Sequence, residues 1–238
     1  MSAAALVDSA REAVTEAYLR TDDYASVAGL LDDALVAARA TGDRKAEAAA
    51  LAQQGMLLHF RAIVHPPEER ATIDPGPEQE LFERALAVRR EANDAEGIAE
   101  SLWHLGLVHQ VLRRDSGAAI PYFRDALARI ESVVGADTWL RSEIHRHIGF
   151  DLLVREERYE DALAELRRSF ELRETLAESG WCVSGLTALA AASRRAGRHE
   201  DAIAYALRAV DLAREEGLLE RHVAAAENEL RAAETLER

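Results

Sequence analysis

A short pattern recurs along this chain at nearly regular spacing. In five amphipathic segments a small residue is followed by leucine, phenylalanine or valine, and the small residues are Ala34, Ala85, Ala126, Ser169 and Ala209. The intervals between them are 51, 41, 43 and 40 residues. Repetition at such a period is typical of solenoid proteins, in which each unit buries its apolar face only against its neighbours. The one long interval predicts a single insertion in an otherwise regular array.

Composition predicts that the repeated units are helical. The chain of 238 residues has five prolines, and four of them fall between residues 66 and 77. The remainder is therefore nearly free of helix breakers, and it is rich in alanine, which has the lowest free-energy cost in a helix. No segment alternates polar residues with β-branched ones as a strand does. We predict an all-α chain.

The positions of capping residues divide the chain into five helix pairs and a final helix. Thr21 or Asp22 is expected to cap the second helix, Gly42 to end it, and Asp115 or Ser116 to cap a later one. The last helix has few large apolar residues, which suits the polar cap that a repeat array needs. The predicted helices cover 4–20 and 23–41, 44–63 and 78–93, 96–113 and 116–134, 138–155 and 159–177, 181–196 and 199–217, and finally 219–236.

The residues within each pair match a known repeat pattern. The third pair has Leu102, Leu105, Gly106, Ala119, Phe123 and Ala126; the fourth has Ile148, Gly149, Tyr159, Ala162 and Ser169; the fifth has Leu186, Leu189, Gly197, Ala202 and Ala209. This pattern resembles the tetratricopeptide repeat (TPR), and the match extends over nearly the whole chain. The resemblance implies a single domain, 1–238, folded as a right-handed α-solenoid of antiparallel helix pairs, with about five repeats and a C-terminal capping helix.

Two features depart from the usual TPR pattern. The period is near 40 residues rather than 34, which is similar to the longer-helix branch found in kinesin light chains and some bacterial regulators. The proline that usually closes each repeat is absent. The insertion covers residues 61–77 in the second pair, where Pro66 and Pro67 are expected to end the preceding helix near Val64. Such a long loop is either functional or a tolerated surface insertion, because loop closure costs little per added residue.

The resemblance implies that the first helix of each pair lines a concave groove. An apolar stripe and several polar groups would then face a ligand, a surface that normally has a partner or a cover. The implied groove residues are Gln53, Met56, His59, Phe60, Glu100, Trp103, His104, Leu107, Glu143, Arg146, His147, Phe150, Arg194 and Arg195.

Two of these helices carry the same Glu-x-x-x-His-x-Gly motif. Glu100 and His104 are four residues apart, as are Glu143 and His147, so each pair shares one helix surface. Two carboxylates and two imidazoles suit zinc, iron or manganese, or a proton-transfer role. The alternative is a solvated polar face with helix-supporting pairs, and we predict no metal or other cofactor.

Charge and motif content exclude several classes of function. The net charge is −14 with no clustered Lys and Arg, which disfavours nucleic acid and anionic membranes as partners. The single cysteine, Cys182, excludes an internal disulfide. The N-terminus lacks the basic and apolar regions of a signal peptide, so we expect a cytoplasmic protein. No phosphate-binding loop, nucleophile elbow or metalloprotease helix occurs.

Three functions remain open at this level. The first is a module that binds a protein, a peptide or a small molecule in the groove, with Trp103, Phe60 and Phe150 as apolar anchors and arginines pairing with an acidic group. The second is a small-molecule enzyme or metal-dependent receptor that uses the glutamates and histidines. The third is an assembly scaffold, including a homodimer, whose groove is filled by another subunit.

Overall fold

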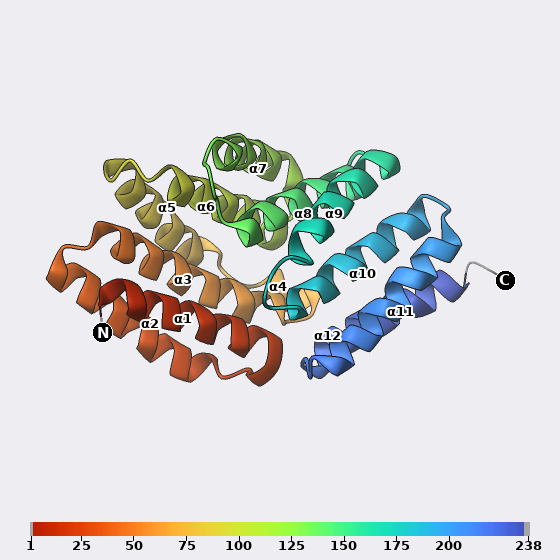
Figure 1. Ribbon diagram of the computed structural model, residues 1–238, viewed down its shortest axis with the longest axis horizontal. Coiled ribbons are helices and arrows are strands. Elements are labelled where there is room, and N and C mark those ends of the chain that lie inside the picture. Colours follow the sequence, from red (N-terminus) through yellow and green to blue (C-terminus); the bar gives the residue numbers. More distant parts are fainter. Residues whose placement is uncertain (1, 236–238) are drawn as a thin grey trace. The chain divides into compact units, whose positions relative to one another are not determined.

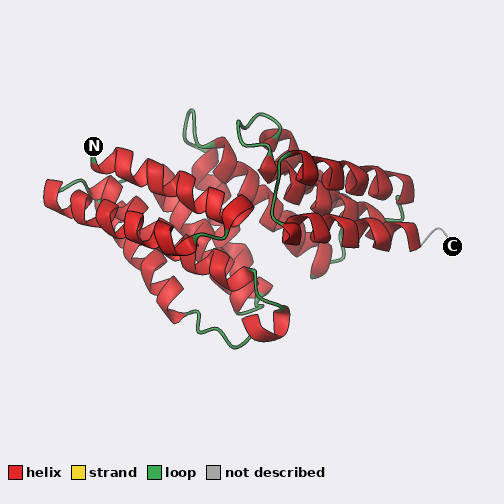
Figure 2. Ribbon diagram, turned by 90° about the horizontal axis from the view of Figure 1, so that it is seen from below, coloured by secondary structure: helices red, strands yellow, loops and turns green. Residues whose placement is uncertain are grey.

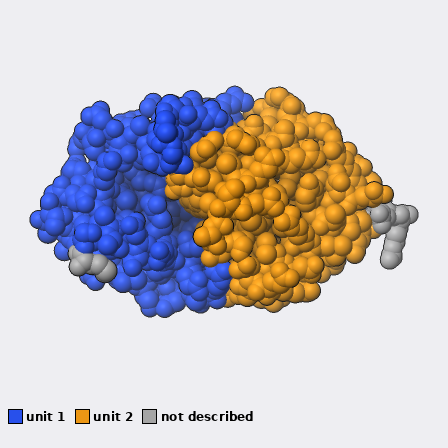
Figure 3. All heavy atoms as spheres, viewed as in Figure 1, with its two compact units in different colours: residues 1–136 blue, residues 137–238 orange. Residues whose placement is uncertain are grey.

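The computed structural model describes residues 2–235, and within this range every regular element is a helix (Figures 1 and 2). The all-α prediction is confirmed. The chain divides into two compact units, residues 1–136 and residues 137–238 (Figure 3).

Unit 1 contains the first seven helices. Apart from the short helix α4, consecutive helices pack on one another. In addition, α1 contacts α3, which in turn contacts α6. One π-helical turn extends α1 over Ala17–Thr21, and another extends α6 over Val108–Leu112. The helices are α1 (Ala3–Glu16), α2 (Tyr24–Thr41), α3 (Arg44–Ile63), α4 (Pro67–Arg70), α5 (Gly76–Glu91), α6 (Ala95–Leu107) and α7 (Ser116–Glu131).

Unit 2 contains the remaining five helices. α10 contacts α8 and α12 as well as its sequence neighbours α9 and α11. The helices are α8 (Thr138–Val154), α9 (Tyr159–Arg173), α10 (Gly180–Arg195), α11 (His199–Glu215) and α12 (Glu220–Thr235).

Local signals set most helix starts and stops. The carboxylate of Asp115 accepts a hydrogen bond from the Ala118 amide and caps α7, one of the two residues predicted for that role. The predicted capping residue of α2 was wrong by one position. Asp22 takes a left-handed conformation (φ 58°) and ends the preceding turn, while Asp23 accepts from the Ser26 amide and caps the helix.

Glycines on the first helix of three pairs let the second helix approach closely. A Cβ atom added to Gly106 would lie 2.4 Å from the ring of Phe123, and one added to Gly55 would lie 2.4 Å from the ring of Phe82. Both rings are fully buried. The repeated glycine therefore sets the spacing at which α6 packs on α7 and α3 on α5.

The insertion forms the short helix α4 and is tied to the rest of unit 1 by arginines. Arg70 donates to the carbonyl oxygens of Ile63 (2.9 Å) and His65 (3.1 Å). Arg114, in the turn before α7, donates to the carbonyl oxygen of Pro67 at 2.5 Å. Arg70 therefore braces the first part of the insertion internally, and Arg114 ties α4 to the turn before α7. Of the helices within residues 2–235, none has both the length and the apolar character needed to cross a bilayer.

Candidate functional site

Most of the predicted groove residues in unit 1 are part of its core. Trp103 and His104 each keep only 1% of their surface exposed, and Glu100 keeps 12% of its side-chain surface. The other buried residues of this set are Gln53, Met56, His59, Phe60 and Leu107. A ligand therefore has no direct access to the apolar stripe along α3 and α6.

Glu100 is bound by arginines rather than by His104. The buried side chain of Arg89 pairs with Glu100 and donates to the Ser101 hydroxyl at 2.6 Å, while Arg11 lies 3.7 Å from the other Glu100 oxygen. Burial by itself raises the pKa of Glu100, but the attraction of the two guanidinium groups outweighs it and lowers that pKa to about 2. Glu100 is thus a structural carboxylate that stays ionised.

His104 is a neutral imidazole inside the core of unit 1. It stacks on Phe82 with ring centroids 4.4 Å apart and an interplanar angle of 9°. Neither ring nitrogen has a hydrogen-bond partner among the described residues. Burial lowers its pKa to about 3, against a weaker opposing effect of Glu100. A group with this pKa and no donor or acceptor contact is a poor general base, so the predicted proton-transfer pair of Glu100 and His104 is not formed.

This burial predicts a pH-dependent stability that His104→Leu removes. The unfolded histidine binds a proton below pH 6.5 and the folded one only below about 3, so the free energy of unfolding falls as pH falls through this range. When the pH is lowered from 7 to 5, we expect the free energy of unfolding of the parent protein to fall by about 2 kcal/mol more than that of His104→Leu. Urea unfolding at the two pH values measures the difference.

Two features of this experiment isolate His104. At pH 5 and above, the low pKa of Glu100 has little effect, because an unfolded glutamate is half protonated only at pH 4.5 and mostly ionised above it. Comparing the parent protein with His104→Leu at both pH values cancels the contributions of the titratable groups that the substitution leaves unchanged. An identical pH dependence for the parent protein and His104→Leu would contradict the assignment.

Unit 2 holds a second buried carboxylate network. Glu143 pairs with the fully buried Arg173, and its other oxygen accepts from Arg146 at 2.7 Å. Arg173 also donates to the Trp181 carbonyl oxygen (2.5 Å) and to the Ser184 hydroxyl (2.6 Å). The predicted pair of Glu143 and His147 is close, at 3.5 Å between oxygen and Nε2, but the arginines supply the stronger contacts.

The two buried arginines were not predicted from the sequence, although they occupy the same place in the repeat. Arg89 and Arg173 each lie four residues after the repeat's small marker residue, and each contacts the residue eleven positions farther along, Glu100 and Ser184 respectively. Residues four apart share one helix face, so an arginine at this place belongs to the buried face of its helix. In the sequence, the signal that could have identified these arginines is a charged residue within an otherwise apolar stripe.

The structure does not support the metal-site hypothesis. Within residues 2–235 no group of three or more His, Cys, Asp and Glu side chains is arranged to hold a metal ion. The four candidates are divided between the units: Glu100 and His104 in unit 1, and Glu143 and His147 in unit 2. Both carboxylates bind guanidinium groups, which occupy the oxygens that a metal would need.

In unit 2, Glu143 and His147 are buried, but the other four predicted groove residues keep part of their surface. Arg146 exposes 20% of its side-chain surface and Arg194 exposes 25%, while Val154 is 60% exposed. On α8 and α10, which contact each other, residues three, four or seven positions apart lie in a row along one side of the helix. We name this surface the arginine face: Arg146, Phe150 and Val154 on α8, and Thr187, Ala191, Arg194 and Arg195 on α10.

Two of the three guanidinium groups on the arginine face already pair with carboxylates of this chain. Arg146 donates to Glu143 at 2.7 Å and contacts His147 Nε2 at 2.8 Å. The guanidinium of Arg146 lies 5.5 Å from the centre of the Phe150 ring. Arg194 pairs with Glu229 of α12 at 2.7 Å. The exposed Arg195 donates only to the Leu153 carbonyl oxygen, at 3.5 Å, and has no carboxylate partner among the described residues.

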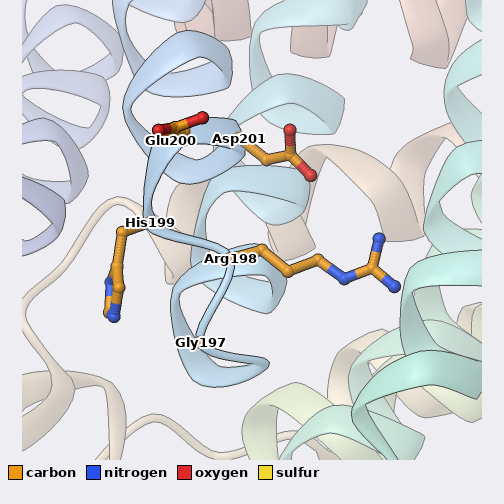
Figure 4. Close-up of a pocket in the computed structure, with 5 residues that line it drawn as sticks. All are labelled: Gly197, Arg198, His199, Glu200 and Asp201. Atoms are coloured by element: carbon orange, nitrogen blue, oxygen red, sulfur yellow. The ribbon is translucent and has the colours of Figure 1, made fainter.

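A pocket of about 490 Å³ opens elsewhere in unit 2, at the turn between α10 and α11 (Figure 4). It is lined by residues 197–201. Figure 4 shows Arg198 and His199 pointing away from each other, and Arg198 pairs with Glu160 at 2.5 Å. The pocket therefore offers no converging set of groups for a ligand.

Comparison with known proteins supports the fold class. No protein-family model and no curated protein matches this sequence. The crystal structure of BtubC (BKLC) from P. vanneervenii is similar, with a TM-score of 0.56 and 18% identity, over 88% of this chain and 87% of that chain. At this identity the likeness concerns the fold alone, and it agrees with an all-α chain.

Proposed function

We propose that this protein is a TPR-type helical-repeat binding module, and that its arginine face holds an extended acidic segment of a partner protein. The solenoid architecture is supported by the serial contacts of α1, α3 and α6 in unit 1 and of α8, α10 and α12 in unit 2. The repeat pattern in the sequence supports the same architecture. The function does not follow from the fold, so it depends on the surface itself.

The observation that carries the proposal is the exposure of three arginines on a single face of an acidic chain. The net charge is −14, yet Arg146, Arg194 and Arg195 gather on two adjacent helices. A guanidinium forms two parallel hydrogen bonds with a carboxylate, and it loses less hydration on binding than an ammonium group does. The exposed apolar surface of Phe150 and Val154 lies beside them and adds non-polar contact area.

Ala191→Glu tests this assignment. Ala191 is half-buried in the middle of the arginine face, so a glutamate there introduces bulk and a negative charge among the arginines. Peptides would first be selected from a displayed library of random twelve-residue sequences on the parent protein. For the selected peptides we expect Ala191→Glu to weaken binding at least tenfold, measured by fluorescence polarisation.

Ala204→Glu is the matched control. Ala204 is exposed on α11, away from the arginine face, and its substitution makes the same chemical change. Binding to this variant should stay within twofold of the parent. Equal binding of the selected peptides to Ala191→Glu and Ala204→Glu would show that the arginine face is not their site. Analytical ultracentrifugation of the parent protein alone distinguishes the remaining case, a face covered by a second copy.

A further inference from the structure

The last helix of unit 2 borders the arginine face and supplies a carboxylate to it. α12 packs on α10 (Figure 1), and the carboxylate of Glu229 accepts a hydrogen bond from Arg194 Nε at 2.7 Å. Both side chains are partly buried, with 25% of the Arg194 surface and 15% of the Glu229 surface exposed. Neither side chain has a second ion-pair partner within residues 2–235. A carboxylate of the partner segment therefore meets an arginine that is already paired.

Glu229 is held much less firmly than Glu143, the carboxylate that pairs with Arg146. One oxygen of Glu143 takes the fully buried Arg173 and the other takes Arg146, so this carboxylate is fixed on both sides. Among the described residues, Glu229 makes one hydrogen bond through one of its oxygens. Rotating the Glu229 side chain to another rotamer breaks that single bond, whereas moving Glu143 would leave a buried guanidinium without its partner.

The adjacent Arg195 is exposed and carries its charge without a carboxylate. It donates to the Leu153 carbonyl oxygen of α8 at 3.5 Å, a weak contact, while Arg194 bonds to α12. A first carboxylate of the partner can therefore reach Arg195 without displacing a carboxylate of this chain. The full charge of Arg194 becomes available to a second one only when Glu229 leaves.

We propose that Glu229 competes with the partner segment for Arg194, and that it thereby sets how tightly the arginine face holds a second carboxylate. This inference rests on the proposed function. When a partner carboxylate displaces Glu229, one ion pair replaces another of the same kind, so the exchange stabilises the complex little. Until Glu229 moves, it also repels that carboxylate, and partial burial weakens the screening of this repulsion by water.

Glu229→Gln tests the competition, because glutamine removes the charge and keeps a side-chain oxygen that can hold Arg194 in place. The ligands are the library-selected peptides whose binding Ala191→Glu weakens. We expect Glu229→Gln to bind them at least fivefold more tightly than the parent protein does, as measured by fluorescence polarisation. Added NaCl should reduce this gain, because salt screens exposed charges. Glu229→Ala also removes the charge and should shift affinity in the same direction. Equal or weaker binding by both variants would overturn the inference.

Glu227→Gln is the matched control on the same helix. The carboxylate of Glu227 pairs with Arg214 at 2.6 Å and with Arg231 at 3.6 Å, and it has no contact with the arginine face. This substitution changes the net charge of α12 by the same amount, so binding should stay within twofold of the parent. A gain as large as that of Glu229→Gln would show that net charge is responsible rather than the pairing of Arg194, and would overturn the inference.

Changes in the peptide test the same point from the other side. Each acidic residue of a selected peptide is replaced in turn by its amide. For the residue that pairs with Arg194, the replacement should weaken binding to the parent protein less than twofold and binding to Glu229→Gln at least fivefold. If every replacement weakens binding to the two proteins by the same factor, the inference fails.

The proposed function and this inference can fail separately. If the selected peptides respond to Ala191→Glu but gain nothing from Glu229→Gln, the arginine face remains their site and the competition by Glu229 is wrong. If Ala191→Glu leaves their binding unchanged, both proposals fail.

Discussion

Replacing Arg173 with methionine is expected to lower the free energy of unfolding by about 3 kcal/mol. Arg173 is fully buried, and its partner Glu143 keeps only 4% of its surface exposed. Removing the guanidinium leaves a buried carboxylate with Arg146 as its remaining cation, and leaves the Trp181 carbonyl without this donor. Breaking a buried ion pair in this way costs more than the pair contributes, because the charge left behind stays desolvated.

The double variant Glu143→Gln/Arg173→Met separates this cause from lost packing. With both charges removed, we expect more than half of the lost stability to return, as measured by urea unfolding followed by circular dichroism. Arg168→Met is the control, because Arg168 is half exposed on α9 and such surface changes usually stay within about 0.5 kcal/mol. A double variant no more stable than Arg173→Met would show that the uncompensated charge is not the cause.

Gly106→Ala is expected to destabilise the protein by about 1–3 kcal/mol, although alanine favours helix formation. The new Cβ would lie 2.4 Å from the Phe123 ring, which is fully buried. Relieving the overlap must push α6 away from α7 or force the ring out of its preferred rotamer. Thermal unfolding of the variant measures the loss.

Gly29→Ala makes the same chemical change with the opposite expected sign. Gly29 is inside helix α2, and an added Cβ there meets no atom within 4 Å. Alanine should therefore raise the free energy of unfolding by about 0.5–1 kcal/mol through its helix preference alone. If both variants shift stability in the same direction, the contact with Phe123 does not explain the glycine at position 106.

The helix boundaries were predictable because the signals that set them are local. Asp115 and Gly42 act on amides and carbonyls a few residues away. The predicted helices 44–63 and 138–155 agree with α3 and α8 to within one residue. The two π-helical turns left no recognised signal. Thr21 and Asp22 were the predicted caps of α2, but Asp22 takes a left-handed conformation and Asp23 caps the helix, which the backbone conformation decides.

The candidate site was harder to predict because exposure depends on distant parts of the chain. The spacing of Glu100 and His104 showed that they share a helix face, but Arg89 on the preceding helix takes the carboxylate. Glu229 was not among the predicted groove residues, because its helix was expected only to cap the array. Its contact with Arg194 joins two helices through residues 35 positions apart in sequence.

The sequence alone determined the all-α class, the helix pairs and the side chains that share each helix face, since periodicity and capping are properties of neighbouring residues. The tertiary structure decided which faces are covered. It buried Trp103 and His104 in the core of unit 1 and left Arg146 and Arg195 partly exposed in unit 2. The physical reason is that burial and ion pairing are set by segments that meet only when the chain folds, such as Arg173 with Glu143, thirty residues apart.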